Sequence, residues 1–429
     1  MFKPFVSSLL TFSISITSID TVAFSLGETI GQTLKTNPQM LSLTHELESR
    51  EYELKQAKAG YLPKVNLSAG YGEETRSAPA TGNEEIDLTR EELAIQAEQL
   101  VFDGFSVYAE VDRQRARVES LSFQARSTAQ QVALRTTEVY LNVMRHTSLL
   151  DLARNSLWEH QNIYDQMALR SKTGVGSRAD LDQIAARLAL ANANMVVAQN
   201  NLADAQANFL RVTGFYPNLE NMLKPELLDG LPSSLEEAVS LAEKNHPTLQ
   251  SAGSDFKAAK AQYKASGGSY WPTIKLEAEK RWDENIGGIE GEDEDLVIAL
   301  RLKYNLFNGG ADRARRKQTA KLVEQAKDIR NNARRQVVES MNLSWNSFEA
   351  LNAQIKYLQQ HVNAASNTKK AYSKQFNIGR RTLLDLLNTE TEVVEARRSL
   401  IEAQFDQIFA NYRILNATGT LLSALGIDY

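Results

Sequence analysis

The stretch "YWPTIKLEAEKRW", residues 270–282, stands out in a chain whose other long segments have the composition of helices. Within it, apolar and charged side chains alternate strictly: Ile274, Leu276 and Ala278 alternate with Lys275, Glu277, Glu279 and Arg281. Alternation with a period of two is typical of a β-strand that has one apolar and one charged face. The pattern alone leaves open whether the apolar face contacts a protein core or lipid.

The amino-acid composition argues against several classes of function. The 429-residue chain carries a formal net charge of −5, which does not favour a nucleic-acid partner. It has no cysteine, so disulfides, thiol nucleophiles and cysteine metal sites are excluded. The five histidines show no metal-ligand spacing: His45, His146, His160, His246 and His361. We therefore expect a protein that works without a metal or another cofactor.

No motif of an active site is recognisable. The stretch "GVGSRA", residues 174–179, matches the dinucleotide fingerprint G-x-G-x-x-A. That fingerprint requires a preceding strand, whereas a long helical pattern precedes it here. No nucleophile with a base, no pair of carboxylates and no phosphate loop can be identified. The sequence predicts a helix-to-helix turn at 174–179 and no enzymatic activity.

The N-terminus has the pattern of a secretory signal peptide. Lys3 precedes an uncharged run over residues 4–19, and Thr21 and Ala23 place small side chains before a cleavage site. We predict a signal peptide at residues 1–23; the alternative is a helical segment that stays on the protein. No other uncharged run approaches the roughly 20 residues of a membrane helix. We expect an exported protein without a transmembrane helix and, lacking a cysteine after the signal, without a bacterial lipid anchor.

The sequence contains an internal duplication. The motif "LP" at residues 62–63 lies 209 residues before "WP" at 271–272, and "FDG" at 102–104 lies 205 residues before "FNG" at 307–309. The offset changes once, by four residues, where a surface loop can absorb the difference. We predict two structural repeats, residues 24–216 and 234–429. A linker at 217–233 joins them and contains three prolines: Pro217, Pro225 and Pro232.

Each repeat has the same predicted layout. A helical segment of roughly 35 residues ends before Pro63 or Pro272, because proline cannot continue a helix. Two alternating strands of about 9–13 residues follow, joined by polar loops that read "TRSAPATGNEEID" and "DENIGGIEGEDED". A helix of about 70 residues and one of about 38 residues complete the repeat. The second long helix carries a narrow apolar seam typical of coiled coils: Met341, Trp345, Phe348, Leu351, Ile355, Leu358, Val362 and Ala365.

The strands decide between a soluble protein and a membrane protein. Four strands leave two open sheet edges, which lipid forbids because it cannot hydrogen-bond free backbone groups. Three copies give twelve strands, an even number within the range of outer-membrane barrels. We predict that the apolar faces contact lipid and that the charged faces line a lumen: Lys275, Glu277, Glu279, Arg281, Arg301 and Lys303. The alternatives are strands of a soluble β-domain and a soluble periplasmic coiled-coil scaffold.

The duplicated layout and its motifs resemble the TolC family of outer-membrane efflux and secretion channels. The motifs are "YLP" and "YWP" before the strands, "FDG" and "FNG" after them, and "FNIGRRTLLDLLNTETEV" at residues 376–393. The resemblance covers essentially the whole chain after residue 23. It implies a fold that is mainly α with a membrane β-part, in which a trimeric twelve-stranded barrel continues into a twelve-helix periplasmic α-barrel. The linker at 217–233 would contribute to a belt around the middle of that α-barrel.

The resemblance also implies a gate at the periplasmic entrance. Its residues here would be Asp180 from the first repeat, and Phe376, Arg381, Asp385 and Asn388 from the second. Asp385 would join an acidic ring and Arg381 would link to Asp180 on a neighbouring helix. Phe376 and Asn388 replace a tyrosine and a carboxylate of some relatives, so one hydrogen bond and part of the ring charge would be missing. The alternative is that Arg381 and Asp385 form an ordinary i, i+4 surface pair.

The implied partners are those of an export system. The helix turns at Gly174 and Gly379 would contact a periplasmic adaptor, which in turn docks an inner-membrane ABC transporter or another pump. We expect the exit duct for type I protein secretion, because a lipid-anchoring cysteine is absent and the C-terminal motif resembles exporters of large adhesins. Small-molecule efflux is the alternative within the family. The sequence leaves the cargo, the adaptor, the pump and the resting state open.

Overall fold

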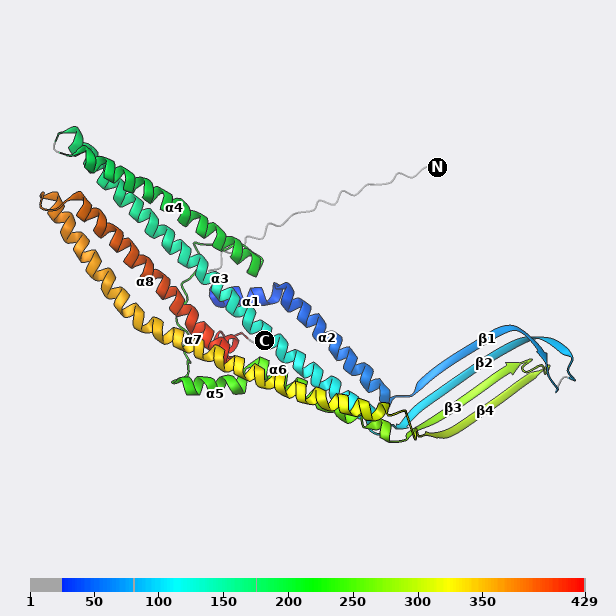
Figure 1. Ribbon diagram of the computed structural model, residues 1–429. Coiled ribbons are helices and arrows are strands. Elements are labelled where there is room, and N and C mark those ends of the chain that lie inside the picture. The colour runs from blue at the N-terminus through cyan, green and yellow to red at the C-terminus, as the bar shows by residue number, and fades with distance from the viewer. Residues whose placement is uncertain (1–24, 80–81, 175, 428–429) are drawn as a thin grey trace, which may run out of the picture.

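The protein is elongated, with a β-sheet at one end and the turns of two helical hairpins at the other (Figure 1). The computed structural model describes residues 25–79, 82–174 and 176–427. The predicted signal peptide, residues 1–23, lies outside these residues. Within them, no helix is both long enough and apolar enough to cross a membrane.

Both repeats contain the same series of elements. The first has α1 (Leu26–Thr36), α2 (Pro38–Lys58), β1 (Lys64–Ser77), β2 (Glu85–Phe102), α3 (Ser106–Lys172) and α4 (Arg178–Thr213). The second has α5 (Leu235–Asn245), α6 (Pro247–Ala265), β3 (Thr273–Glu284), β4 (Glu292–Lys303), α7 (Ala311–Asn377) and α8 (Leu383–Thr418). Two short 3-10 turns (Ala59–Tyr61 and Gly268–Tyr270) precede β1 and β3, and the short helix α9 (Leu421–Ala424) follows α8.

The first helical segment of each repeat is broken, so the expectation of one helix of roughly 35 residues is wrong. The breaks fall before Pro38 and Pro247, whose rings disfavour a helical conformation at the preceding residue. The preceding residues are extended and cap the next helix: the Asn37 side chain accepts from the backbone N–H of Gln39 at 2.9 Å, and His246 Nδ1 accepts from that of Thr248 at 3.2 Å. Each proline then begins a new helix, where its missing N–H costs nothing.

The four strands form one antiparallel sheet in the order β1-β2-β3-β4. β1 and β2 have 14 and 18 residues and are longer than predicted, whereas β3 and β4 have 12 each. The loops between β1 and β2 and between β3 and β4 are correspondingly shorter than the predicted polar loops. Leu276 lies opposite Gln99 of β2 and Leu300 of β4, and Ala278 lies opposite Ala97 and Ile298. Because opposite residues share a face, the register places most of the large apolar residues of the four strands on one side.

The helices form the rest of the molecule. α3 and α7 have 67 residues each and pack along α4 and α8, which have 36 each. The predicted seam of α7 is buried or half-buried along its length, with Met341 fully buried and Ala365 buried. The Asp103 carboxylate, directly after β2, begins α3 by accepting from the backbone N–H groups of Ser106 at 3.0 Å and Val107 at 2.7 Å.

The main apolar core lies at mid-length of the helices, and the linker between the repeats packs on it. Tyr140 of α3 is fully buried there, and its hydroxyl donates to the Leu223 carbonyl at 2.8 Å. Burial raises the pKa of Tyr140 to about 12. On α8, the Asn411 side chain accepts from the Leu228 N–H at 3.0 Å and donates to its carbonyl at 3.2 Å. The linker is therefore held against α3 and α8.

Candidate functional site

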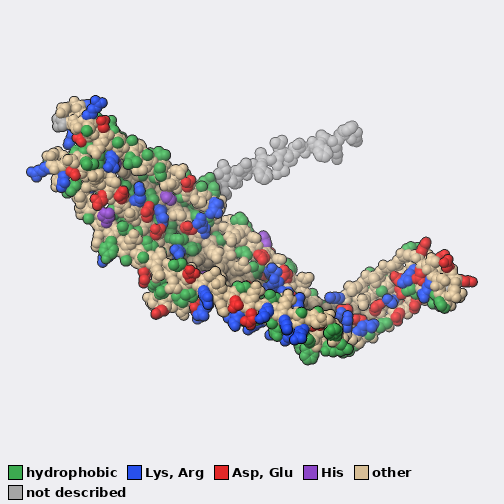
Figure 2. Space-filling model, viewed as in Figure 1, with side chains coloured by type: hydrophobic (Ala, Val, Ile, Leu, Met, Phe, Trp, Pro, Cys, Tyr) green, Lys and Arg blue, Asp and Glu red, His purple; other side chains and the backbone are tan. Residues whose placement is uncertain are grey.

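The charged face of the sheet carries ion pairs between neighbouring strands. Lys275 Nζ lies 2.8 Å from Glu98 Oε1 on β2, and Arg301 of β4 pairs with Glu277 of β3. Arg281 pairs with Glu279 along β3 at 2.7 Å. The residues predicted to line a lumen share this face, because they alternate with the apolar positions in the register described above. Figure 2 shows acidic and basic side chains interleaved over the sheet.

The opposite face of the sheet is apolar and exposed. Leu67, Ile298 and Leu300 are each between 67% and 69% exposed although they belong to paired strands. An apolar surface of this extent on a single chain marks a site that contacts lipid or another protein. Large aromatic side chains gather where the sheet meets the helices: Tyr61, Phe105, Tyr270, Trp271, Tyr304 and Phe307 are all exposed.

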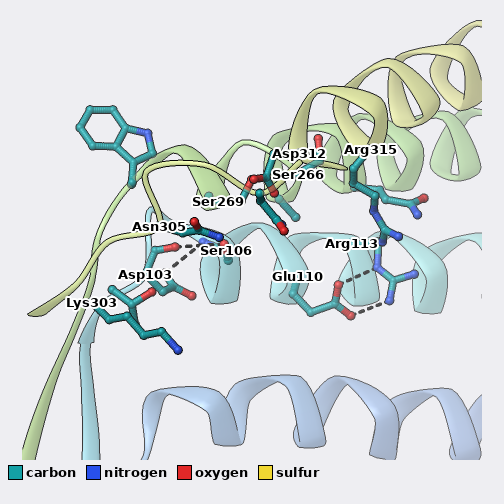
Figure 3. A pocket seen from close by; sticks show the side chains of 16 residues that line it. Asp103, Ser106, Glu110, Arg113, Ser266, Ser269, Lys303, Asn305, Asp312 and Arg315 are labelled. Atoms are coloured by element: carbon teal, nitrogen blue, oxygen red, sulfur yellow. Dashed lines mark hydrogen bonds and ion pairs between the residues drawn. The ribbon is translucent and has the colours of Figure 1, made fainter. Parts of the chain in front are cut away.

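A polar hollow lies where the sheet joins the helices (Figure 3). Its volume is about 770 Å³, and Thr273 and Lys303 of the charged sheet face contribute to its lining. The Glu110 carboxylate accepts from Arg113 Nε at 2.7 Å and Nη2 at 2.6 Å, and these bonds hold the pKa of Glu110 below its usual range. Asp312 and Arg315, at the start of α7, line the same hollow. The charged surface thus continues from the sheet onto the helices.

The turns of the two helical hairpins lie at the end of the molecule farthest from the sheet (Figure 1). Gly174 follows α3 with φ of +75° and Gly379 follows α7 with φ of +74°. Glycine adopts this left-handed conformation without the steric penalty of a Cβ atom. The structure places both glycines in the predicted turns, and their contact with an adaptor stays a prediction.

Asp385 holds the beginning of α8. Its carboxylate accepts from the backbone N–H of Thr382 at 3.2 Å and from its hydroxyl at 2.9 Å, and the Asp385 N–H donates back to that hydroxyl at 3.2 Å. This is a capping box, which satisfies donors that a helix start leaves free. The hydrogen bonds from Thr382, with a smaller effect from Arg381, lower the pKa of Asp385.

Arg381 contacts three side chains of its own hairpin, two on α7 and one on α8. Its guanidinium lies 4.1 Å from the centre of the Tyr372 ring, Nε donates to Gln375 Oε1 at 3.0 Å, and Nη1 lies 4.0 Å from Asp385 Oδ2. Asp180 lies in the first turn of α4, and no contact joins it to Arg381 within the described residues of one chain. A link between the two side chains across neighbouring protomers stays a prediction.

The comparison with known families decides the identity of the fold. The family model of outer membrane efflux proteins matches residues 29–214 and 238–420, one range in each repeat. The chain belongs to the outer membrane efflux protein family. Members of this family are channel and transport proteins, and this chain is an outer-membrane export channel.

Three relatives of this family align with most of the chain. The outer membrane efflux protein BepC of Brucella suis is 25% identical over 85% of this chain and 78% of its own. The outer membrane protein TolC of Escherichia coli is 23% identical over 98% and 87%, and the proteases secretion protein PrtF of Dickeya chrysanthemi is 23% identical over 96% and 92%. Among solved structures, the outer membrane protein VceC of Vibrio cholerae superposes with a TM-score of 0.79 at 16% identity, covering 92% of this chain and 96% of VceC.

The remaining predicted gate residues of this family member differ in exposure. Asn388 is exposed on α8, whereas Phe376 is only 7% exposed. Phe376 packs in an apolar cluster near the tips that joins both hairpins, and the Arg170 guanidinium lies 4.9 Å from its ring centre. Its side chain is therefore part of the packing between the hairpins.

An ion-pair cluster close to the tips was not among the residues predicted from the sequence. Lys369 of α7 lies 2.6 Å from Glu390 Oε2 on α8 and 3.2 Å from Glu159 Oε1 on α3. Glu390 is only 3% exposed. One signal was present in the sequence, because Glu390 interrupts the apolar face of α8 beside Leu386, Leu387 and Val393. Its partners lie on other helices and follow only from the packing.

Proposed function

We propose that three copies of this chain form the outer-membrane exit duct of a type I protein secretion system. The observation that carries this proposal is the four-stranded sheet, which has an exposed apolar face and an ion-paired charged face and continues directly into long helices. The apolar face would contact outer-membrane lipid, and the charged face would surround the path of the cargo. The duct supplies a conduit and a gate, and it has no catalytic role.

The open edges of the sheet support the proposed trimer. Among the residues that the structure describes, β1 and β4 each pair with a strand on one side only. Unpaired backbone groups are not tolerated in lipid, so the edges have to meet those of other copies. Three copies close a barrel of twelve strands, and the helices of the three copies would form one α-barrel. The tips at Gly174 and Gly379 would then meet a periplasmic adaptor and, through it, an inner-membrane ABC transporter.

Protein cargo is favoured by the relative that is named for protease secretion. PrtF aligns over nearly the full length of both chains. BepC, named as an efflux protein, supports the alternative of small-molecule efflux, but it aligns over less of both chains.

At the entrance, we propose that Arg381 meets Asp180 of the partner subunit and that the three Asp385 carboxylates face one axis.

A deletion strain tests the proposed cargo. Loss of the gene should remove one or more large proteins from the culture medium, as measured by mass spectrometry, while the minimal inhibitory concentrations of dyes and antibiotics stay within about twofold. A plasmid copy of the gene is the control and should restore secretion. An unchanged set of secreted proteins together with increased drug sensitivity would show that efflux is the function.

A further inference from the structure

In a single chain, the sheet and the helices that continue from it form one wall with two open edges. Each edge consists of a strand and a helix. β1 and α2 lie along one edge, and β4 and the adjoining part of α7 lie along the other (Figure 1). Inside the chain, the corresponding joint between the repeats is filled: β2 pairs with β3, and α3 packs on α6. The joint inside the chain is therefore a template for the joint between chains.

The two sequence offsets relate paired residues of the sheet as well as sequence motifs. In the first hairpin, Lys64 lies opposite Glu98. Adding 209 to the first number and 205 to the second gives Thr273 and Lys303, which lie opposite each other in the second hairpin. The duplication thus conserves the register of the sheet, and the offsets can be applied to the joint between the repeats.

Applied to that joint, the offsets give a definite register. Ala97 lies opposite Ala278 and Ile95 opposite Lys280 in the β2–β3 pair. The equivalent residues are Leu302 with Ala69, and Leu300 with Tyr71. We propose that β4 of one protomer pairs with β1 of the next in this register, and that α7 packs on α2 of the partner subunit as α3 packs on α6. This inference rests on the trimer proposed above.

The register agrees with the chemistry of both faces. It brings Leu302 and Leu300 beside Ala69 and Tyr71 on the apolar face, so the face that would meet lipid continues across the joint. Farther toward the loops, the same register places Asp295 opposite Arg76 on the charged face. Both side chains are exposed, and neither has an ion pair within the described residues of its own chain. Opposite charges directly across an antiparallel pair stabilise it.

The helices carry a matching set of polar contacts. Inside the chain, the Ser120 and Ser251 hydroxyls lie 3.0 Å apart, and those of Ser127 and Thr248 lie 2.9 Å apart. Adding 205 to the α3 residue and subtracting 209 from the α6 residue gives the equivalent pairs between protomers. These are Gln325 with Ser42, and Asn332 with Gln39; all four residues are exposed in the single chain and can hydrogen-bond.

One ion pair between the repeats has no direct equivalent between protomers. Lys257 pairs with Glu119 inside the chain at 3.0 Å, but the equivalent residues, Glu48 and Glu324, are both acidic. Lys321 precedes Glu324 by three residues, is exposed, and has no ion pair within the described part of its chain. We expect Lys321 to lie beside Glu48 of the partner subunit and to take the place of Lys257.

Disulfide cross-linking tests the register, and the chain has no native cysteine to interfere. The variant Leu300→Cys with Tyr71→Cys should give covalent dimers and trimers in outer membranes treated with an oxidant, because Cβ atoms of directly opposite residues lie within disulfide reach. Two matched controls move the partner by two residues on the same face: Leu300→Cys with Ala69→Cys, and Leu300→Cys with Glu73→Cys. We expect at least fivefold less cross-linking in either control.

The helical half is tested in the same way, with Gln325→Cys and Ser42→Cys expected to cross-link and Gln325→Cys with Glu46→Cys as the control. Light scattering of the detergent-extracted protein separates two kinds of failure. A trimer that cross-links best in a control variant overturns the register and leaves the proposed duct intact. A protein that is monomeric and gives no cross-link overturns both the joint and the trimer.

Discussion

At the scale of single residues, the Asp385 carboxylate caps α8, and in the proposed duct it would also supply charge at the entrance. The variant Asp385→Asn removes the charge and leaves an oxygen that can accept from Thr382, whereas Asp385→Ala removes both. We expect both variants to lower cation selectivity in planar bilayers, and only Asp385→Ala to lower the unfolding temperature as well. Arg381→Ser should instead raise conductance, because it frees the turn. If Asp385→Asn keeps the cation selectivity of the wild type, the charge of Asp385 does not contribute to selectivity and the proposed acidic ring is wrong.

The pH dependence of cation selectivity distinguishes two opposite effects on the pKa of Asp385. Hydrogen bonds from Thr382 lower the pKa of Asp385, so within one chain the group stays ionised well into the acidic range. Three carboxylates that converge on one axis would raise one another's pKa and titrate as a coupled set. Selectivity should fall as pH falls, since protonation removes the charge. A midpoint above the ordinary pKa of aspartate would show that the three groups converge, and a midpoint below it that capping dominates.

At the scale of helices and strands, the sequence predicts the type and order of elements and leaves their pairing undetermined. Alternation in 273–284 and the seam of α7 are local patterns, so both are readable from one chain. The breaks before Pro38 and Pro247 were missed because proline is compatible with the first turn of a helix. The helix turns at Gly174 and Gly379 are predictable from the sequence, because glycine favours the left-handed conformation that ends each long helix. The partners of Arg381 and the burial of Phe376 depend on how four helices pack, which no local pattern encodes.

Lys369 shows what such packing adds, because it ties α7 to both α3 and α8 close to the tips. The variant Lys369→Met leaves the buried Glu390 carboxylate without its cation, and we expect it to lower the free energy of unfolding by up to about 3 kcal/mol. Glu390→Gln should cost less, since no buried charge remains. Combining Lys369→Met with Glu390→Leu should recover most of the loss. Thermal unfolding followed by circular dichroism measures all three, and an additive double variant would exclude direct coupling.

At the scale of the whole molecule, the duplication explains how a short sheet and long helices make one wall. Each repeat contributes two strands and one helical hairpin, and the same order in both halves places all turns between paired strands at one end and the hairpin tips at the other (Figure 1). The length of the helices and the position of the sheet thus give the chain a definite polarity. In the proposed duct, the strand turns face outside the cell and the tips lie in the periplasm.

Site-specific labelling tests this polarity on intact cells. Ile289, in the turn between β3 and β4, is 69% exposed, and Glu84 is exposed in the turn between β1 and β2. Gly82 and Gly288 in the same turns are poorer choices, because their φ angles of +70° and +73° strain any residue with a Cβ atom. Cysteines at Glu84 and Ile289 should react with a membrane-impermeant maleimide on intact cells. The matched control is Leu190→Cys on α4, which is 51% exposed and should react only after the outer membrane is permeabilised. If Leu190→Cys reacts on intact cells and the two turn variants react only after permeabilisation, the orientation of the duct is the reverse of the one proposed.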